Sequence, residues 1–327
     1  MTELSIILVN WNAVDYLREC IASIYENTST IRFEIIVIDN GSSIGNIEDI
    51  RAVFPRISIL KSSQNLGFAK ANNLGFRHSS GELVLILNPD TKLVGPAINV
   101  LIDEMKKRPD AGIMGGRHVS PDLTVQTTSI QKFPTILNQA LNIEYLRRRW
   151  PQFRLWNLAP LFSGGSEPVQ VEVIPGACML LRRELFEIVG GFSEDYFMYA
   201  EDIDLNVKVA KLGFKNYYVP GATIIHYGGK SSCQQKTSQW ATVMKFRAMG
   251  KFYQKNHGHR YALAYRCVMG ACAVLRVVAM MAAYPVSVLA RQKERVRESL
   301  DKWVAILKWA LGLEQRIFNS HSKPSER

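Results

Sequence analysis

The sequence predicts an α/β fold, in which a mixed, mainly parallel sheet is sandwiched between helices and a helical appendage follows. Three short apolar runs, at residues 4–9, 33–38 and 83–87, support this prediction. Each run ends in a cluster of polar residues, and helical patterns separate the runs. Because strands buried on both faces lack polar alternation, continuous apolar runs of this length are typical of a parallel sheet covered by crossover helices.

Helices are expected at residues 14–26 and 70–78, where apolar side chains recur at helical spacing. In a sheet of this kind, ligands bind outside the carboxyl ends of the strands. Asn10, Asp39 and Asp90 each follow or end one of the predicted strands. The sequence therefore predicts that these three side chains face one crevice.

A second cluster of polar residues contains Glu201, Asp202 and Asp204. Carboxylates this close repel one another unless a metal ion, a proton or a cationic group lies nearby, so they indicate a functional site. The alternative is an acidic first turn of a helix that continues to Lys211, which the helix dipole would favour. The strand-end carboxylates upstream favour the functional interpretation.

Five motifs together resemble the family 2 inverting glycosyltransferases of the GT-A fold, over residues 3–235. The motifs are SIILVNWN at residues 5–12, IVIDNGS at 36–42, NLGFAKANN at 65–73, NPDT at 88–91 and the Glu201-Asp202 segment. A strand that ends in Asp is also typical of Rossmann proteins. The Gly-x-Gly-x-x-Gly fingerprint after the first strand and the Walker A loop are both absent from the sequence, which disfavours those two classes.

The resemblance implies that a nucleotide-sugar donor binds at the strand ends. Asp39 would accept a hydrogen bond from the ring N–H of uracil or thymine. On local sequence alone, Asp39 could equally be an Asx-turn residue before Gly41, and Lys70 could be a solvated helix charge. The residues predicted to bind the donor are Val9, Asn10, Asp39, Gly67, Lys70, Asn72, Asn88 and Lys230.

The resemblance also implies a divalent metal ion, because Asn88-Pro89-Asp90 occupies the place of the family's Asp-x-Asp motif. Asn88 replaces the first carboxylate and can still bind a ribose hydroxyl, so Asp90 is predicted to be the principal ligand. His226 is predicted to contact the metal or phosphate, although a lone histidine is often structural. Mg²⁺ and Mn²⁺ both suit a carboxylate combined with phosphate oxygens, and imidazole favours Mn²⁺.

Inverting transfer requires a base that removes a proton from the acceptor hydroxyl. The family pattern assigns this role to Asp202, whereas the residues alone do not rank it against Glu201. Glu201 is predicted to orient the acceptor or the base, and Asp204 to cap or pair within the helix. Neighbouring carboxylates raise one another's pKa, which suits a base that works near neutral pH.

Within the family, the resemblance is closest to bacterial rhamnosyltransferases that build surface polysaccharide. It implies dTDP-rhamnose as the donor and a saccharide linked to polyprenyl diphosphate as the acceptor. One alternative is a transferase of the same fold that uses a UDP-hexose or UDP-N-acetylhexosamine. Another is a catalytically silent assembly subunit, which the intact Asp39, Asp90 and Asp202 disfavour.

The compartment is predicted from the cysteines and the first residues. The chain of 327 residues contains five cysteines, an odd number, and no Cys-x-x-Cys pair, so neither a zinc site nor a disulfide framework is indicated. A strand begins at Leu4 without a preceding basic segment or cleavage pattern, so no signal peptide is expected. A reducing cytoplasmic compartment is therefore predicted.

The positive charge is concentrated in the carboxyl-terminal part of the chain. Residues 251–327 contain 14 Lys and Arg against 5 Asp and Glu, whereas residues 1–250 contain 26 against 24. We therefore divide the chain into a catalytic domain at 1–250, amphipathic helices at 251–318 and a polar tail at 319–327.

The predicted helices of this region could contact a membrane. The longest uncharged stretch, residues 277–290, has 14 residues, fewer than the about 20 that a spanning helix needs. Apolar residues recur at helical spacing over 296–311, together with Trp303, Trp309 and several basic residues. Such a helix can lie in the interface of an anionic membrane, here the cytoplasmic face of the cell membrane. The alternative is helices that pack on the catalytic domain or in a homodimer.

A second basic cluster contains Arg147, Arg148, Arg149 and Arg154. It could bind lipid phosphate or the diphosphate of a polyprenyl-linked acceptor, or it could be a solvated helix end. Nucleic acid is not predicted as a partner, because the sequence contains no recognisable nucleic-acid-binding motif.

Overall fold

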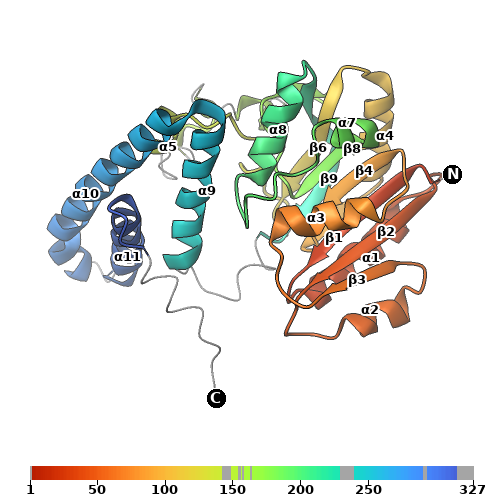
Figure 1. Ribbon diagram of the computed structural model, residues 1–327, viewed down its shortest axis with the longest axis horizontal. Helices are drawn as coiled ribbons and strands as arrows, with labels where there is room; N and C mark the ends of the chain where they lie inside the picture. Colours follow the sequence, from red (N-terminus) through yellow and green to blue (C-terminus); the bar gives the residue numbers. More distant parts are fainter. Residues whose placement is uncertain are drawn as a thin grey trace. The chain divides into compact units, whose positions relative to one another are not determined.

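The computed structural model describes residues 2–141, 149–153, 156, 158–162, 164–228, 239–289 and 293–314 (Figure 1). Contacts within the chain divide it into two compact units. The first comprises Met1–Phe133, Glu144–Phe197 and Glu201–Gln234. The second comprises Pro134–Ile143, Met198–Ala200 and Gln235–Arg327. The boundary predicted at residue 250 falls inside a helix of the second unit.

The first unit is built on a nine-stranded mixed sheet with the strand order β3-β2-β1-β4-β8-β6-β9-β5, in which β7 pairs with β9. β1, β2, β3 and β4 run parallel, whereas β8 is antiparallel to β4, and β5 and β7 are antiparallel to β9. The strands are β1 Leu4–Asn10, β2 Phe33–Asn40, β3 Ser58–Ser62, β4 Leu83–Leu87, β5 Thr91–Val94, β6 Ala111–Val119, β7 Val169–Val171, β8 Cys178–Arg182 and β9 Lys215–His226.

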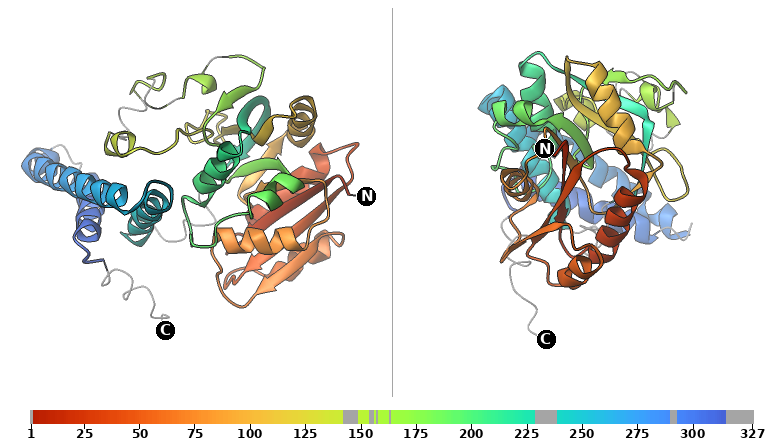
Figure 2. Two further views of the ribbon diagram at one scale, coloured as in Figure 1. Left: turned by 45° about the horizontal axis from the view of Figure 1, so that its top comes forward. Right: turned by 90° about the vertical axis from the view of Figure 1, so that its right-hand side faces the viewer.

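Helices cover both faces of this sheet (Figure 2), as expected for strands without polar alternation. α1, α2 and α4 pack on one face, and α3, α7 and α8 pack on the other. The helices are α1 Val14–Asn27, α2 Ile47–Val53, α3 Phe68–Arg77, α4 Ala97–Lys107, α7 Arg183–Ile188 and α8 Glu201–Lys211, with a 3-10 turn at Ala159–Leu161. The predicted helices at 14–26 and 70–78 correspond to α1 and α3.

The residue register places the predicted strand-end residues side by side. Asn10 is the last residue of β1 and pairs with Asp39 of β2. β4 ends at Leu87, opposite Leu8, so the segment that contains Asp90 leaves the sheet beside the end of β1. The prediction that three strand ends meet at one edge of the sheet is therefore confirmed.

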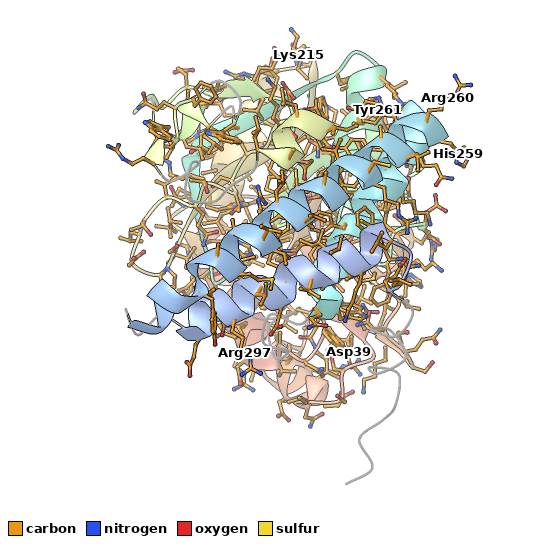
Figure 3. All side chains as sticks on the ribbon, turned by 90° about the vertical axis from the view of Figure 1, so that its left-hand side faces the viewer. Asp39, Lys215, His259, Arg260, Tyr261 and Arg297 are labelled. Carbon is orange, nitrogen blue, oxygen red and sulfur yellow. The ribbon has the colours of Figure 1, made fainter. Side chains whose placement is uncertain are left out.

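The second unit consists of α5 Ile136–Ala140, α9 Gln239–His257, α10 His259–Leu289 and α11 Lys293–Ala310. Its helices have an aromatic core of their own, in which Tyr265 contacts Phe246, Tyr253 and Trp309 at ring distances of 4.7–6.4 Å. Figure 3 shows α10 and α11 packed lengthwise against each other, with His259, Arg260 and Tyr261 at one end of α10. This unit therefore does not consist of isolated surface helices.

Two expectations about the carboxyl-terminal helices need correction. Trp309 was expected at a membrane interface, but it is 5% exposed, because it packs in the aromatic core of the unit. Trp303 lies under the Arg276 guanidinium, and the distance from the Trp303 ring centroid to Arg276 Cζ is 4.1 Å. The predicted uncharged stretch at 277–290 is part of a longer apolar helix, because α10 runs unbroken from His259 to Leu289.

Candidate active site

The first part of the site is a polar pair at the ends of β1 and β2. Asn10 is fully buried, and its side-chain amide donates to Asp39 Oδ1 at 3.3 Å and to Ser42 Oγ at 3.1 Å. Asp39 is partly exposed, so one side of its carboxylate is open to a ligand. The Asn10 Oδ1 atom is buried and has no hydrogen-bond partner among the described residues. A buried acceptor of this kind suits a donor group on a bound base.

Asn40, at the end of β2, holds the neighbouring loop in place. Its Oδ1 accepts from the backbone N–H of Leu66 at 2.8 Å, and its Nδ2 donates to Asn65 Oδ1 at 3.0 Å. Sequence reasoning assigned no role to Asn40 or Asn65. A buried polar residue at the end of an apolar strand is the signal that could have identified Asn40.

Gly67 brings this loop into contact with the segment before α8. Its φ is +79° and its ψ is 173°, a conformation that only glycine adopts readily. A Cβ atom at Gly67 would lie 2.2 Å from the Phe197 carbonyl oxygen, which accepts a hydrogen bond from Phe68 N–H. Of the predicted donor-binding residues that follow, Lys70 is exposed on α3, whereas Asn72 is buried and donates to the Phe68 carbonyl.

Asp90 and His226 form the second part of the site. Asp90 is fully buried, and its Oδ1 lies 3.7 Å from His226 Nε2. The pairing of β5 with β9 brings these residues together, because Thr91 lies opposite His226. Burial lowers the pKa of His226, and the Asp90 carboxylate opposes that shift. A neutral imidazole beside a carboxylate is a donor set that fits Mn²⁺ or Mg²⁺ if substrate oxygens and water complete it.

Asn88 is partly exposed and connects the Asp90 segment to β8. Its backbone N–H donates to the Ala177 carbonyl at 3.0 Å. The next residue upstream, Gly176, donates its N–H to Asp202 Oδ2, also at 3.0 Å. The Asp90 segment and the acidic start of α8 are therefore joined through two consecutive residues, Gly176 and Ala177.

The acidic pair at the start of α8 combines two different environments. Asp202 is partly exposed, and its second oxygen accepts from Ile203 N–H at 2.8 Å. Burial raises the pKa of Asp202, while its backbone hydrogen bonds lower it. Glu201 is 5% exposed, and its Oε2 has no hydrogen-bond partner among the described residues. Burial, together with the neighbouring Asp202 charge, raises the pKa of Glu201 to about 8.

The turn before these carboxylates has an unusual backbone. Tyr199 and Ala200 have φ values of 71° and 65°, in the left-handed region that side chains other than those of Gly, Asn and Asp rarely adopt. Strained residues of this kind concentrate at functional sites. The helix that follows is nevertheless ordinary, since it has acidic residues in its first turn and Lys208 and Lys211 in its last. Both interpretations of the acidic cluster are therefore compatible with the structure.

Residues 5–190 match the sequence profile of Glycosyl transferase family 2, which covers more than half of the chain. The chain belongs to this family.

The chain is also similar to two relatives that are named as rhamnosyltransferases. It is 30% identical to N-acetylglucosaminyl-diphospho-decaprenol L-rhamnosyltransferase of Mycobacterium tuberculosis, over 74% of this chain and 81% of that protein. It is 26% identical to rhamnosyltransferase WbbL of Escherichia coli, over 75% of this chain and 92% of that protein. The expected family and its rhamnosyltransferase relatives are thus confirmed.

Solved structures confirm the GT-A fold. The mannosyltransferase PcManGT from Pyrobaculum calidifontis, in complex with GDP-Man and Mn²⁺, superposes with a TM-score of 0.60 at 17% identity, over 96% of this chain and 87% of that chain. GalNAc-T7 with UDP, GalNAc and Mn²⁺ superposes with a TM-score of 0.54 at 13% identity, over 78% and 51% of the two chains.

Three remaining predicted residues of this family 2 chain have different outcomes. Lys230 lies outside the described residues. Val9 is partly buried and packs against a small cluster of Ile36, Ile38 and Ala71 on β2 and α3, so its side chain contributes to the core. Asp204, predicted to cap or pair within the helix, accepts hydrogen bonds from the preceding loop, from Ser193 Oγ at 2.5 Å and from Tyr196 OH at 3.4 Å.

Proposed function

We propose that this family 2 chain is an inverting rhamnosyltransferase that transfers rhamnose from dTDP-rhamnose to a lipid-linked saccharide. The observation that supports an inverting reaction best is the Asp202 carboxylate. It is partly exposed, and two backbone N–H groups hold its oxygens in a fixed orientation. A positioned carboxylate that an acceptor can reach meets the requirement for a general base.

In the proposed reaction, the acceptor hydroxyl attacks the anomeric carbon and breaks the bond to the diphosphate oxygen. The hydroxyl proton passes to Asp202, and the nucleoside diphosphate leaves from the opposite face of the sugar. Glu201 is held protonated at neutral pH by its raised pKa, so it can donate a hydrogen bond without adding charge beside the base.

Asp39 and Asn10 are proposed to recognise the pyrimidine base. The partly exposed Asp39 carboxylate can accept from the ring N–H of thymine, and Asn10 holds it at 3.3 Å. Asn88, the residue after the end of β4, is proposed to contact the ribose. Both M. tuberculosis and E. coli relatives are named as rhamnosyltransferases, which supports rhamnose as the transferred sugar.

Asp90 and His226 are proposed to hold a divalent metal ion. The ion, when bound, offsets the negative charge that develops on the departing diphosphate. Among the described residues no group of three or more His, Cys, Asp or Glu side chains could hold a metal ion. The pair therefore depends on diphosphate oxygens to complete the coordination, as Mg²⁺ and Mn²⁺ sites commonly do. Both solved neighbours named above contain Mn²⁺, which supports this proposal.

We propose that the chain binds its acceptor at the cytoplasmic face of the cell membrane, and that α10 contacts this membrane. Arg266 and Arg276, the two charged residues inside the apolar part of α10, both turn inward. Arg266 donates to the Trp309 and Ala310 carbonyls, and Arg276 donates to the Ala140 carbonyl. The exposed side chains between residues 263 and 284 are consequently all uncharged, and they include Leu263, Val274, Leu275, Val278 and Met281.

The stretch His259–Ala282 of α10 is, among the described helices, the one long and apolar enough to cross a bilayer, and 22% of an 18-residue apolar segment within it is buried. Its inward hydrogen bonds to α11 and α5 support contact through one face of the helix instead of a crossing. The M. tuberculosis relative is named for a decaprenol-linked acceptor, which supports a reaction at a membrane surface.

The function can be tested by incubating the purified full chain and Mn²⁺ with dTDP-rhamnose, UDP-glucose, UDP-N-acetylglucosamine or GDP-mannose, each with and without N-acetylglucosaminyl-diphospho-polyprenol. We expect rhamnosyl transfer from dTDP-rhamnose, with the opposite anomeric configuration by NMR. Transfer from a UDP-sugar alone would overturn the donor assignment, and a product with retained configuration would overturn the role of Asp202.

The metal can be tested separately with Asp90→Ala. We expect this variant to lose transfer, because the substitution removes the proposed metal-binding carboxylate. Its melting temperature should stay close to that of the unmodified chain, because the substitution also removes a buried charge. Full activity of the unmodified chain in excess chelator would contradict the metal proposal.

A further inference from the structure

Gln126 clamps His226 with both ends of its side-chain amide. Gln126 Nε2 donates to the His226 backbone carbonyl at 2.6 Å, and Gln126 Oε1 lies 3.2 Å from His226 Nδ1. Nothing in the sequence pattern indicated this residue, which lies in a connection without helical or strand periodicity.

The first of these contacts fixes which way the amide faces. A carbonyl oxygen accepts hydrogen bonds and cannot donate them, so the group that faces the His226 carbonyl at 2.6 Å must be the amide NH₂. The Gln126 oxygen then faces Nδ1 of the same histidine. Because that oxygen also accepts only, Nδ1 must carry the ring proton.

The backbone around Gln126 is held by a short hairpin. Val119 and Val125 form an antiparallel bridge, and Gln126 N–H donates to the His118 carbonyl at 2.9 Å. Ser129 Oγ donates to the Gln126 carbonyl at 2.7 Å. The side-chain amide therefore starts from a fixed backbone position, which reduces the entropy cost of clamping His226.

The other neighbour of the His226 ring does not compete for its protons. His118 packs edge-on against His226 with a centroid distance of 5.6 Å. Its own ring nitrogens have no hydrogen-bond partner among the described residues, so it contributes only packing on this side. Gln126 and Asp90 are the polar side chains for which contacts to the His226 ring are described.

We propose that Gln126 is a positioning residue that holds His226 as the Nδ1–H tautomer, with the Nε2 lone pair directed toward Asp90. This inference rests on the proposed metal-binding role of His226. The opposite tautomer would set two lone pairs against each other at Gln126 and direct an N–H group at Asp90. That N–H would block the nitrogen from metal binding, since only an unprotonated ring nitrogen is a ligand.

The tautomer can be measured in the metal-free full chain by long-range ¹H–¹⁵N NMR of labelled histidines, with the His226 signals assigned from His226→Gln. We expect Nδ1–H in the unmodified chain. In Gln126→Met, which keeps the side-chain length and removes both hydrogen bonds, we expect a shift to Nε2–H. Nδ1–H then loses its acceptor, whereas the negative charge of Asp90 lies 3.7 Å from Nε2 and favours a proton there.

Two further variants act as controls. Gln131→Met changes a glutamine of the same connection whose backbone pairs with Val173, and it should leave the tautomer unchanged. Gln126→Glu retains an acceptor for Nδ1–H and should preserve the tautomer. This variant is also used if Gln126→Met proves unstable. An Nε2–H tautomer in the unmodified chain, or an unchanged tautomer in Gln126→Met, would overturn the inference.

Mn²⁺ affinity in the presence of thymidine diphosphate gives the second readout, measured by calorimetry. Loss of an outer-shell partner of this kind commonly lowers metal affinity by about 10–100-fold, and we expect a loss in that range for Gln126→Met. Equal affinity in the two chains would overturn the positioning role. If the Nδ1–H tautomer is observed but no chain binds Mn²⁺, the metal proposal fails and the assignment of the tautomer stands.

Discussion

At the scale of single residues, the adjacent carboxyl groups of Glu201 and Asp202 are both affected by burial but differ in their hydrogen bonds. Burial raises the pKa of Asp202, but two backbone N–H groups donate to its oxygens and oppose that shift. Glu201 is buried beside the Asp202 charge, which favours its neutral form. This separation of roles is consistent with one base and one neutral hydrogen-bond donor at the start of α8.

Asp202→Asn tests the base. Asparagine has nearly the same shape but cannot take up the acceptor proton, so turnover should fall by about 100-fold or more. Donor affinity, measured by calorimetry with the nucleotide sugar, should change little. Parallel loss of donor binding and turnover would show that Asp202 holds the donor or the fold instead.

Glu201→Gln tests the raised pKa through the pH dependence of stability. The pKa in the folded chain is about 8, above the ordinary value of 4.5. Between these values the unfolded chain is ionised and the folded chain is protonated, so unfolding releases a proton and stability falls as pH rises. Glutamine cannot ionise and avoids this loss.

The unmodified chain should therefore lose stability relative to Glu201→Gln as pH rises from 5 to 9, by an amount on the order of 4 kcal/mol. Urea unfolding of both chains at several pH values measures this difference directly. A difference that does not change with pH would mean that Glu201 ionises normally.

At the scale of elements, the site depends on close contacts between loops that lie far apart in the sequence. Asn40 holds the loop at 65–67, and Gly67 then approaches the Phe197 backbone. On the other side, Asn88 is hydrogen-bonded to Ala177, next to the Gly176 that supports Asp202. At Gly67 the missing side chain lets backbone approach backbone, where a Cβ atom would separate the two loops.

Gly67→Ala should disturb this arrangement, since the new Cβ would lie 2.2 Å from the Phe197 oxygen. Gly95→Ala is the matched control, because Gly95 also has a positive φ, of 62°, but no atom within 4 Å of an added Cβ. The control should lose about 1–2 kcal/mol from the left-handed backbone alone.

Gly67→Ala should lose clearly more stability than this control, as measured by urea unfolding, and it should also lower turnover. Equal losses in the two variants would show that the Phe197 loop moves away without cost and that the close contact does not support the site.

At the scale of the whole molecule, the second unit has a packed core and an apolar exterior on α10. Tyr253, Tyr265 and Trp309 are buried inside it, whereas Leu275 is 70% exposed. An uncharged helix face of this length is unusual on a surface that faces only water. The excess of basic residues in 251–327 would attract anionic lipid to the same part of the chain.

Leu275→Lys tests membrane contact against a matched control. Ile188, on α7 of the first unit, is 69% exposed, so Ile188→Lys adds the same charge at a site of equal exposure. We expect the full chain to sediment with anionic vesicles and Leu275→Lys to bind about tenfold more weakly or worse, because an apolar side chain contributes about 1.5–3 kcal/mol when removed from water.

Ile188→Lys should bind these vesicles like the unmodified chain. High salt should weaken binding by screening but not abolish it, because the apolar contribution remains. An equal loss in both variants, or no binding by the unmodified chain, would contradict membrane contact through α10.

Three of the nine strands, the polar residues that follow them and the family could be predicted from the sequence alone. These features are local, because an apolar run specifies a buried strand, and parallel strands place their carboxyl ends at one edge of the sheet. Asn10, Asp39 and Asp90 could therefore be predicted to lie at one edge of the sheet before any contact was known. The acidic pair Glu201 and Asp202 was found in the same way, as a local charge pattern.

The contacts of the remaining residues could be found only in the folded chain. Gln126 is hydrogen-bonded to His226, and Gly176 to Asp202, across strands and loops that are distant in the sequence. A local sequence pattern does not indicate which distant residues come into contact. Trp309 has the same spacing whether its helix packs on lipid or on protein, since both surroundings are apolar. Its burial against Tyr265 was settled only by the aromatic residues that α9 and α10 supply.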